Sequence, residues 1–204
     1  MTYIDLTLSF TDDMPVDPGD PKSELKQIAD IASAGYVDHL LHTAMHVGTH
    51  IDAPLHMLDG GKRITDFVAD KFFGRGVLID VRGAASIGAD ALANGALQKG
   101  DIVLFLTGFS EKFRTPDYYD KHPEITPEAA EVLVAAGVSI VGMDMPSPDR
   151  PPFHTHRILL GKDILIIENL TNLEELIGKE FDVIALPAKL EAEAAPVRVV
   201  AKIR

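Results

Sequence analysis

Histidine and carboxylate side chains gather in one short segment of the chain. Residues 46–56 read His46-Val-Gly-Thr-His50-Ile-Asp52-Ala-Pro-Leu-His56, so four side chains able to bind a metal ion fall within eleven residues. The chain has no cysteine, so any bound metal must be held by imidazole and carboxylate groups. The segment therefore predicts a metal site built without sulfur.

The spacing of these four residues indicates how the segment must fold. Glycine, proline and β-branched residues disfavour a helix here, and in an extended chain all four side chains share one face. A straight strand would spread them over about 33 Å, too far to share one ion. We expect bends at Gly48 and Pro54. His50 and Asp52, about 7 Å apart along a strand, can then meet one cation while the bends return His46 and His56 to it.

A second group of candidate ligands lies in the C-terminal half. His154 and His156 precede Glu168, which directly follows the apolar run Ile164–Ile167. If that run is a parallel strand, Glu168 stands at its carboxyl end, where sites in open α/β sheets collect. A carboxylate there could instead cap a following helix. Asp144 ends another apolar run and could line the same crevice, although the prolines after it favour a turn.

The remaining histidines carry less information. His39 and His42 precede the main segment, and His122 stands before a proline in a polar stretch. We expect surface or core roles for these three.

Most of the chain reads as alternating strands and helices that must position these groups. The apolar runs that suit buried strands are 77–81, 102–106, 140–143, 164–167 and 183–186. A helix over 126–137 is well marked, with Thr126 as N-cap, Pro127 in the first turn and Gly137 as C-cap. Weaker helices are predicted over 89–97 and 172–177. In the N-terminal part, 3–10 suits an edge strand and 36–46 an extended segment.

This order predicts an α/β fold in a single domain, residues 1–204. Strands separated by single helices favour a mostly parallel central sheet. The N-terminal strands have no helices between them and should form a second, more antiparallel layer.

The amino-acid composition limits the kinds of molecule that the protein is expected to bind. The 204 residues include 31 acidic and 19 basic side chains, a formal net charge of −12, which should repel nucleic-acid phosphates and anionic membranes. No run approaches the roughly 18 apolar residues of a membrane span, and residues 1–10 do not resemble a signal peptide. We expect a soluble, cytoplasmic protein.

The segment 46–56 resembles the signature of the cyclase-like metal hydrolases, a family that includes bacterial kynurenine formamidase and isatin hydrolase. Similarity extends over nearly the whole chain. The further stretches that carry it are Thr107-Gly-Phe-Ser110, Asp144-Met-Pro-Ser-Pro-Asp149, Glu168-Asn-Leu170 with Leu173, Ala185-Leu-Pro187 and Pro196-Val-Arg198.

The resemblance implies a role for each matching residue. His46, His50 and Asp52 match the ligands of a first metal, and Asp52 would bridge to a second metal held by His156 and Glu168. His56 matches the residue that donates and accepts a proton. The resemblance also implies a layered β/β/α fold of the swivelling type, one or two zinc or manganese ions per chain, and a homodimer or homotetramer.

The chain departs from the formamidases in one loop. Residues 15–20, Pro-Val-Asp-Pro-Gly-Asp, resemble their substrate loop, but Asp17 stands where that enzyme has tryptophan, and the chain contains no tryptophan. Asp17 offers charge instead of a flat apolar wall, which disfavours formylkynurenine and favours a cationic or hydrogen-bond-donating amide. Alternatively, Asp17 points to solvent in a Pro-Gly turn. Phe109, Phe113, Tyr118 or Tyr119 could still supply an aromatic contact.

The function indicated is hydrolysis of a linear or cyclic amide C–N bond. A bound divalent metal lowers the pKa of its water and polarises the carbonyl, while His56 can deliver the proton that an amine leaving group needs. Two alternatives remain at this point. One is a metal-dependent cyclase or dehydratase, and the other is a metal-binding protein without catalysis.

Overall fold

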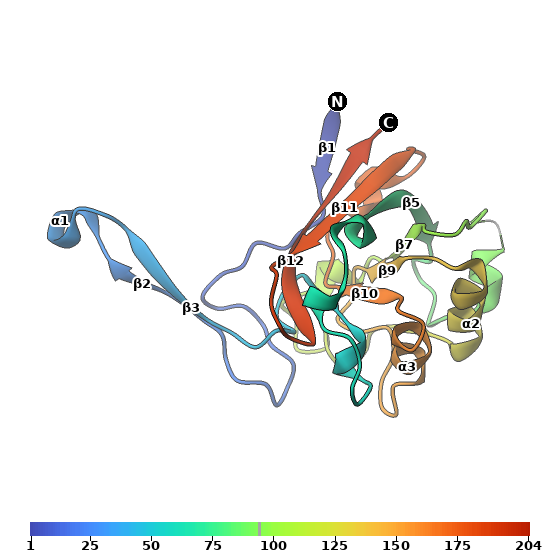
Figure 1. Ribbon diagram of the computed structural model, residues 1–204, viewed down its shortest axis with the longest axis horizontal. Coiled ribbons are helices and arrows are strands. Elements are labelled where there is room, and N and C mark those ends of the chain that lie inside the picture. The colour runs from blue at the N-terminus through green and yellow to red at the C-terminus, as the bar shows by residue number, and fades with distance from the viewer. Residues whose placement is uncertain (94) are drawn as a thin grey trace.

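The computed structural model of the protein describes residues 1–93 and 95–204. Its body is built on one sheet, and a long hairpin arm projects from it (Figure 1). The strands of this sheet are β1 (Thr2–Asp5), β4 (His50–Asp52), β5 (Phe73–Asp80), β7 (Ile102–Leu106), β9 (Ile140–Met143), β10 (Leu165–Glu168), β11 (Phe181–Pro187) and β12 (Ala194–Ile203).

Four neighbouring strands form the parallel part of the sheet. β5, β7, β9 and β10 lie in this order and run parallel. Every residue of β7 and β9 is buried, which explains why these strands read as unbroken apolar runs. The predicted strands 102–106 and 140–143 are confirmed to the residue. The run 164–167 is shifted by one, so that Glu168 is the last residue of β10.

The prediction of a layered, swivelling-type domain is wrong, because the sheet closes into a barrel. The strand order is β1-β12-β11-β5-β7-β9-β10-β4, and β12 also pairs with β4. β12 is long enough to do both: it pairs with β11 through 197–203 and with β4 through 194–196. β11 was expected among the parallel strands but pairs antiparallel with both β12 and β5. The antiparallel strands thus complete one closed sheet and do not form a second layer.

Helices are few, and the best-marked one is where the sequence predicts it. α2 (Pro127–Ala136) begins after Thr126, whose hydroxyl accepts a hydrogen bond from the Ala129 backbone N–H, and ends at Gly137 in the left-handed conformation. α3 (His154–Leu160) was not predicted. Both helices pack near the parallel strands (Figure 1).

The two weaker helix predictions are wrong in type. Within 89–97 the structure has a 3₁₀ turn, η4 (Ala89–Leu92), and residue 94 lies outside the described residues. Within 172–177 it has η6 (Leu173–Leu176), flanked by Asn172 and Gly178, both with positive φ, which stop a longer helix. The other 3₁₀ turns are η1 (Pro54–His56), η2 (Ile64–Asp66), η3 (Ala69–Phe72) and η5 (Phe109–Lys112).

Two apolar clusters hold the body together. One joins residues from parallel and antiparallel strands alike, including Leu104, Ile167 and Val199, and so fills the space that the barrel encloses. The other packs the opposite face of the parallel strands, such as Phe105, against α2 and α3. Since consecutive residues of a strand point to opposite faces, β7 supplies both clusters, which fixes the strand ends that carry the site.

The arm consists of β2 (Glu24–Ala29), α1 (Ile31–Ala34) and β3 (Asp38–His42). β2 and β3 form a separate two-stranded antiparallel sheet, which extends away from the body (Figure 1). The extended segment expected over 36–46 is therefore confirmed over part of its length. β1 is an edge strand as predicted, but shorter than 3–10.

Two shorter features complete the structure. β6 (Ser86–Ile87) and β8 (Glu124–Ile125) form a small parallel pair.

Within the part of the chain that the structure describes, no helix has the length and apolar character needed to cross a membrane.

Candidate metal centre

Strands β4 and β10 bring three of the predicted ligands together inside the protein. His50 and Asp52 are two residues apart on β4 and therefore share a face. Glu168 lies directly opposite His50 in the antiparallel β4–β10 pair. The Nε2 atom of His50 is 3.5 Å from Oδ1 of Asp52 and 3.3 Å from Oε2 of Glu168. All three side chains are buried.

The expected bends are present on both sides of β4. Gly48 has φ of +67°, in the left-handed region that favours glycine, and a Cβ there would lie 2.6 Å from the Met14 side chain. Pro54 begins the 3₁₀ turn η1, which ends at His56. These bends return the two outer histidines of the segment toward β4.

His46 and His56 lie beside this buried group. The Nδ1 atom of His46 is 3.0 Å from Oδ1 of Asp52 and 3.2 Å from Nε2 of His50. The ring of His56 lies on that of His46, with 4.1 Å between the centroids. The atoms of His46, Asp52 and His56 that could bind a metal lie within 4.8 Å of one another, as do those of His50, Asp52 and Glu168.

Helix α3 supplies the remaining predicted ligand, and the structure separates its two histidines. His156 is buried with Nε2 3.4 Å from Oε1 of Glu168, whereas His154 is exposed. Residues two apart on a helix point in very different directions, so only one of the pair can face the site.

Sequence reasoning missed the residue that orients His156. The Nδ1 atom of His156 lies 2.5 Å from Oδ1 of Asp149, whose other oxygen accepts a hydrogen bond from the Thr155 backbone N–H. On the other side of the site, Nδ1 of His50 lies 2.8 Å from the Gly48 carbonyl oxygen. In both rings a proton on Nδ1 leaves the Nε2 lone pair facing the carboxylates, which is how histidine is held when it binds a metal. The signal in the sequence was an acid seven residues before His156.

The residues fit a divalent cation. Both carboxylate oxygens of Asp52 are fully buried, and among the described residues neither accepts a hydrogen bond. His46, although close, faces Asp52 without hydrogen-bond geometry. A buried charge that lacks a hydrogen bond is unstable unless something compensates it, and imidazole nitrogens aimed at the same point suit a divalent metal ion.

The pKa values of the buried histidines also indicate that this position favours positive charge. Burial alone would lower the pKa of His50, but the negative charge of Asp52 and the hydrogen bond to Glu168 outweigh it and raise this pKa to about 9. For His156 burial is likewise outweighed, by Asp149 and Glu168, and its pKa rises to about 10. Without a metal, protons are thus drawn into the position that a cation would take.

A cavity of about 290 Å³ opens beside the ligands. His46, His56, His156 and Glu168 line one part of it. The residues that line the rest are Asp17, Asp20, Met57, Tyr119, Pro146, Ser147, Phe153 and Asn169. Burial, together with the negative charges of Asp20, Glu168 and Asp120, raises the pKa of Asp17. Asp17 is thus exposed to solvent and at the same time part of the cavity lining.

Of the aromatic residues considered for this wall, Tyr119 lines the cavity. Tyr118 is buried, donates a hydrogen bond to Oδ1 of Asn169 and stacks on Phe109. Asp144, the other strand-end acid, accepts hydrogen bonds from the Thr107 hydroxyl and the backbone N–H groups of Thr107 and Gly108. These hydrogen bonds occupy the Asp144 carboxylate and stabilise the turn that Thr107 and Gly108 form after β7.

The other histidines lie where the sequence suggested. His39 and His42 are exposed on the arm, and His122 is buried against the Pro123 carbonyl oxygen.

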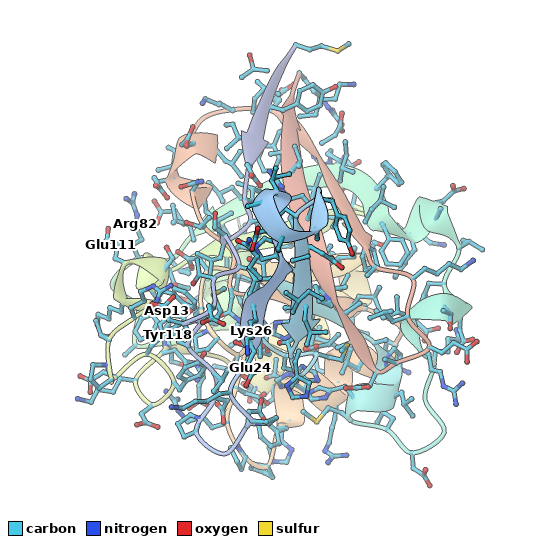
Figure 2. The ribbon with its side chains drawn as sticks, turned by 90° about the vertical axis from the view of Figure 1, so that its left-hand side faces the viewer. Asp13, Glu24, Lys26, Arg82, Glu111 and Tyr118 are labelled. Carbon is cyan, nitrogen blue, oxygen red and sulfur yellow. The ribbon has the colours of Figure 1, made fainter. Side chains whose placement is uncertain are left out.

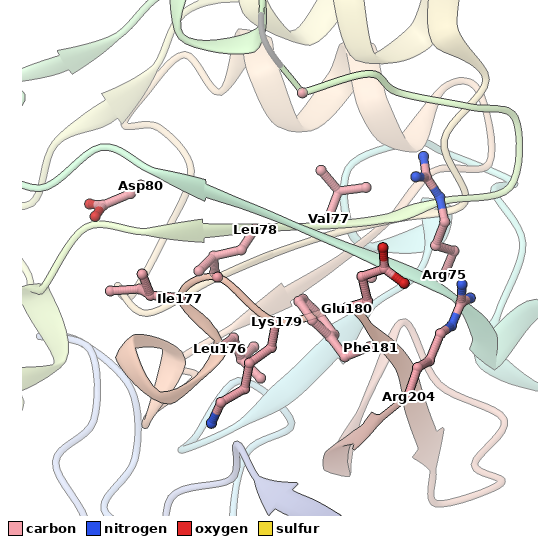
Figure 3. Close-up of a pocket in the computed structure, with 13 residues that line it drawn as sticks. Arg75, Val77, Leu78, Asp80, Leu176, Ile177, Lys179, Glu180, Phe181 and Arg204 are labelled. Carbon is pink, nitrogen blue, oxygen red and sulfur yellow. The ribbon is translucent and has the colours of Figure 1, made fainter.

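Another hollow, of about 400 Å³, shares no lining residue with the site cavity (Figure 3). Its arginines are already paired, Arg75 with Asp101 and Arg204 with Asp182.

Comparison with known proteins gives consistent matches over most of the chain or nearly all of it. The family model "Cyclase: Putative cyclase" matches residues 4–150. A kynurenine formamidase of Bacillus mycoides (strain KBAB4) is 30% identical over 203 residues, which cover 97% of this chain and 96% of the relative.

Solved structures give the same result. Isatin hydrolase A from Labrenzia aggregata, bound to benzyl benzoate, superposes with a TM-score of 0.88 at 25% identity, covering 98% of this chain and 93% of the other. A predicted metal-dependent hydrolase from Bacillus stearothermophilus gives a TM-score of 0.83 at 28% identity, covering 98% and 97%.

Proposed function

The chain belongs to the Cyclase family, and on that premise we propose that it is a metal-dependent hydrolase that splits an amide-type C–N bond. The observation that carries the proposal is the Asp52 carboxylate, which is buried, accepts no hydrogen bond from the described residues and faces imidazole nitrogens. The names of the relatives, kynurenine formamidase and isatin hydrolase, support an amide as the substrate.

We assign the ligands to two groups. His46, His50 and Asp52 would hold a first ion, and His156 with Glu168 would hold a second, with Asp52 shared between them. The charge and donor set accommodate one or two divalent ions, zinc or manganese. When bound, such an ion supplies a hydroxide at neutral pH and draws the electrons of the amide carbonyl.

The chain's own residues provide the rest of the chemistry. His56 lines the cavity and rests on the ring of His46, so it can meet a substrate amide next to the ligands. An amine leaves poorly as an anion, and His56 can hand it a proton taken from the attacking water. Asp149 keeps His156 in one orientation, and Gly48 does so for His50.

The substrate class follows from the cavity wall. Asp17 and Asp20 bring negative charge to the wall and Tyr119 an aromatic ring. We propose a small linear or cyclic amide that carries a cationic or hydrogen-bond-donating group. Formylkynurenine should be a poorer substrate, because an aspartate replaces the aromatic wall that the formamidase loop offers.

A hydrolysis screen tests this function. The purified protein, loaded with zinc or with manganese, is given linear formamides, lactams and cyclic imides in ¹⁸O-labelled water. Hydrolysis places the label in a new carboxylate, whereas cyclisation or dehydration does not. The His154→Ala variant should keep the activity, since that side chain is exposed on the same helix as His156, while His156→Ala should lose it. No turnover of any amide with either metal would contradict the proposal.

Assembly as a homodimer or homotetramer and a cytoplasmic location are further expectations of the family resemblance, and both stay predictions.

A further inference from the structure

Asn169 directly follows the ligand Glu168 and lines the same cavity. Its backbone is left-handed, with φ of +58°, a conformation that asparagine tolerates better than most residues. Its N–H donates to the Met145 carbonyl oxygen at 3.0 Å, and its carbonyl oxygen accepts a hydrogen bond of 2.6 Å from the Thr49 hydroxyl. Two other segments of the chain therefore fix this residue beside the ligands.

The side chain of Asn169 is held as well as its backbone. The Tyr118 hydroxyl donates a hydrogen bond of 2.8 Å to Oδ1 of Asn169. Tyr118 is buried, and its ring stacks on Phe109. The rings of Phe113 and Tyr119 stand nearly perpendicular to it. Figure 2 views the molecule from the side of the arm and labels Tyr118 inside the outline of the body. Because the ring is packed on several sides, its hydroxyl sets the orientation of the Asn169 amide.

This contact leaves the amide nitrogen of Asn169 free for a ligand. Nδ2 lies across the amide group from Oδ1 and turns away from Tyr118. Within the described residues Nδ2 donates no hydrogen bond, and it is not one of the fully buried polar atoms that lack a partner. Asn169 is only 3% exposed and lines the cavity, so Nδ2 opens toward the cavity.

The charges around the cavity favour a donor in this place. Asp17, Asp20 and Glu168 line the same cavity, and their carboxylates would repel an oxygen there but attract an N–H group. The Ser147 hydroxyl, which also lies in the wall, already donates a hydrogen bond of 2.7 Å to the Asp149 carbonyl oxygen. Asn169 thus offers the cavity a neutral donor that the protein has oriented in advance.

We propose, on the premise that the protein hydrolyses amides, that Nδ2 of Asn169 donates a hydrogen bond to the carbonyl oxygen of the substrate amide. Attack of water on the carbonyl carbon forms a C–O bond and moves the electron pair of the C=O double bond onto the oxygen. That oxygen carries negative charge until the C–N bond breaks. A donor held in place beforehand stabilises this charge without reorganising. Asn169 is then a catalytic residue, and Tyr118 is the residue that positions it.

Substitutions at position 169 test the donor, with the amide that the natural protein hydrolyses best as substrate. Asn169→Gly removes the side chain without backbone strain, because glycine readily adopts positive φ. Asn169→Asp keeps the shape and the acceptor for Tyr118 but has no N–H to donate. Both should lower kcat by about 10- to 100-fold, the range for a hydrogen bond to a charged group. KM should change less, because the charge develops only in the transition state. Elemental analysis should show unchanged metal content.

Asn172 offers a matched control. It has nearly the same backbone conformation, with φ of +57°, but its Nδ2 donates to the Asp5 carbonyl oxygen at 2.9 Å, and it does not line the cavity. Asn172→Gly should therefore keep the natural kcat. A natural kcat in Asn169→Gly would show that this asparagine serves only the backbone turn, and a natural kcat in Asn169→Asp would show that the N–H is not used. Either result would overturn the proposal, as would a rise in KM alone.

Tyr118→Phe tests the positioning role. It should lower kcat of the natural protein by about 2- to 10-fold, the range for one neutral hydrogen bond. In the Asn169→Gly background it should have no further effect, because the group that it positions is gone. An equal loss in both backgrounds would overturn this role. If the natural protein hydrolyses no amide, the proposed function fails and this assignment with it. If the natural protein is active and Asn169→Gly matches it, only the assignment of Asn169 fails.

Discussion

Glu168 and His50 are direct cross-strand partners in β10 and β4, and their side chains meet with 3.3 Å between Oε2 and Nε2. One residue ends a parallel strand and the other begins an antiparallel one, so the metal centre lies where the two parts of the barrel join. Because backbone pairing sets this register, neither side chain can move far without the strands moving too.

Substitution of His50 should remove the metal. His50→Ala deletes a buried nitrogen from the centre of the ligand group, and elemental analysis should then show loss of bound ions. Glu168→Gln should lose at most one ion, because the ligands assigned to the first ion remain. His39→Ala is the control, since His39 is exposed on the arm. Full metal content in His50→Ala would contradict the assignment.

The Asp149 carboxylate, which contacts Nδ1 of His156, should increase the affinity of the site for metal. Asp149→Asn keeps the size of the side chain but removes the charge that holds Nδ1 of His156. Partners of this kind typically change metal affinity by about 10- to 100-fold. A chelator competition assay should show the weakening for one ion and little change for Glu131→Gln, an exposed acid on α2. Equal affinities in the two variants would make Asp149 a merely structural residue.

His56 should be needed for turnover and not for binding of the metal. His56→Ala should lower kcat by about 10²- to 10⁴-fold, the range for loss of a positioned acid–base group. Elemental analysis should find metal content largely kept. If metal and activity disappear together, His56 is a ligand; a natural rate would remove it from the mechanism.

Removal of metal should destabilise the fold. The Asp52 carboxylate is buried and accepts no hydrogen bond within the described part of the chain, so a bound ion would compensate a charge that otherwise lowers stability. At metal concentrations 100 times the Kd, binding stabilises the native state by about 2.7 kcal/mol. For a chain of this size that corresponds to a fall in Tm of roughly 5–10 °C when a chelator is added. Thermal unfolding of His50→Ala should be insensitive to the chelator.

Asp17 should influence the choice of substrate. Asp17→Asn removes negative charge from the cavity wall and should raise kcat/KM for anionic amides while lowering it for cationic ones. The natural protein should act on formylkynurenine with kcat/KM below about 10⁴ M⁻¹s⁻¹, the lower end for proficient enzymes, and better on a small cyclic amide. A higher value on formylkynurenine alone would show that Asp17 does not set specificity.

Much of the centre could be predicted from local sequence. The clustering of ligand-type residues over 46–56 indicated a metal site, and Gly48 and Pro54 indicated where the chain bends. These features are local because a positive φ or a proline ring constrains its own residue, whatever lies elsewhere in the chain. The same holds for α2, whose Thr126 and Gly137 caps fixed its two ends.

Tertiary structure decided what depends on distant parts of the chain. Closure of the barrel required β12 to reach both β11 and β4, and no pattern within 194–203 specifies a second partner strand. The packing of α3 chose His156 over His154 as the histidine that faces Glu168. The sequence by itself determined which chemical groups are present and where the chain turns. Only the packing of strands and helices decided which groups meet, because register and closure arise from contacts between residues far apart in the chain.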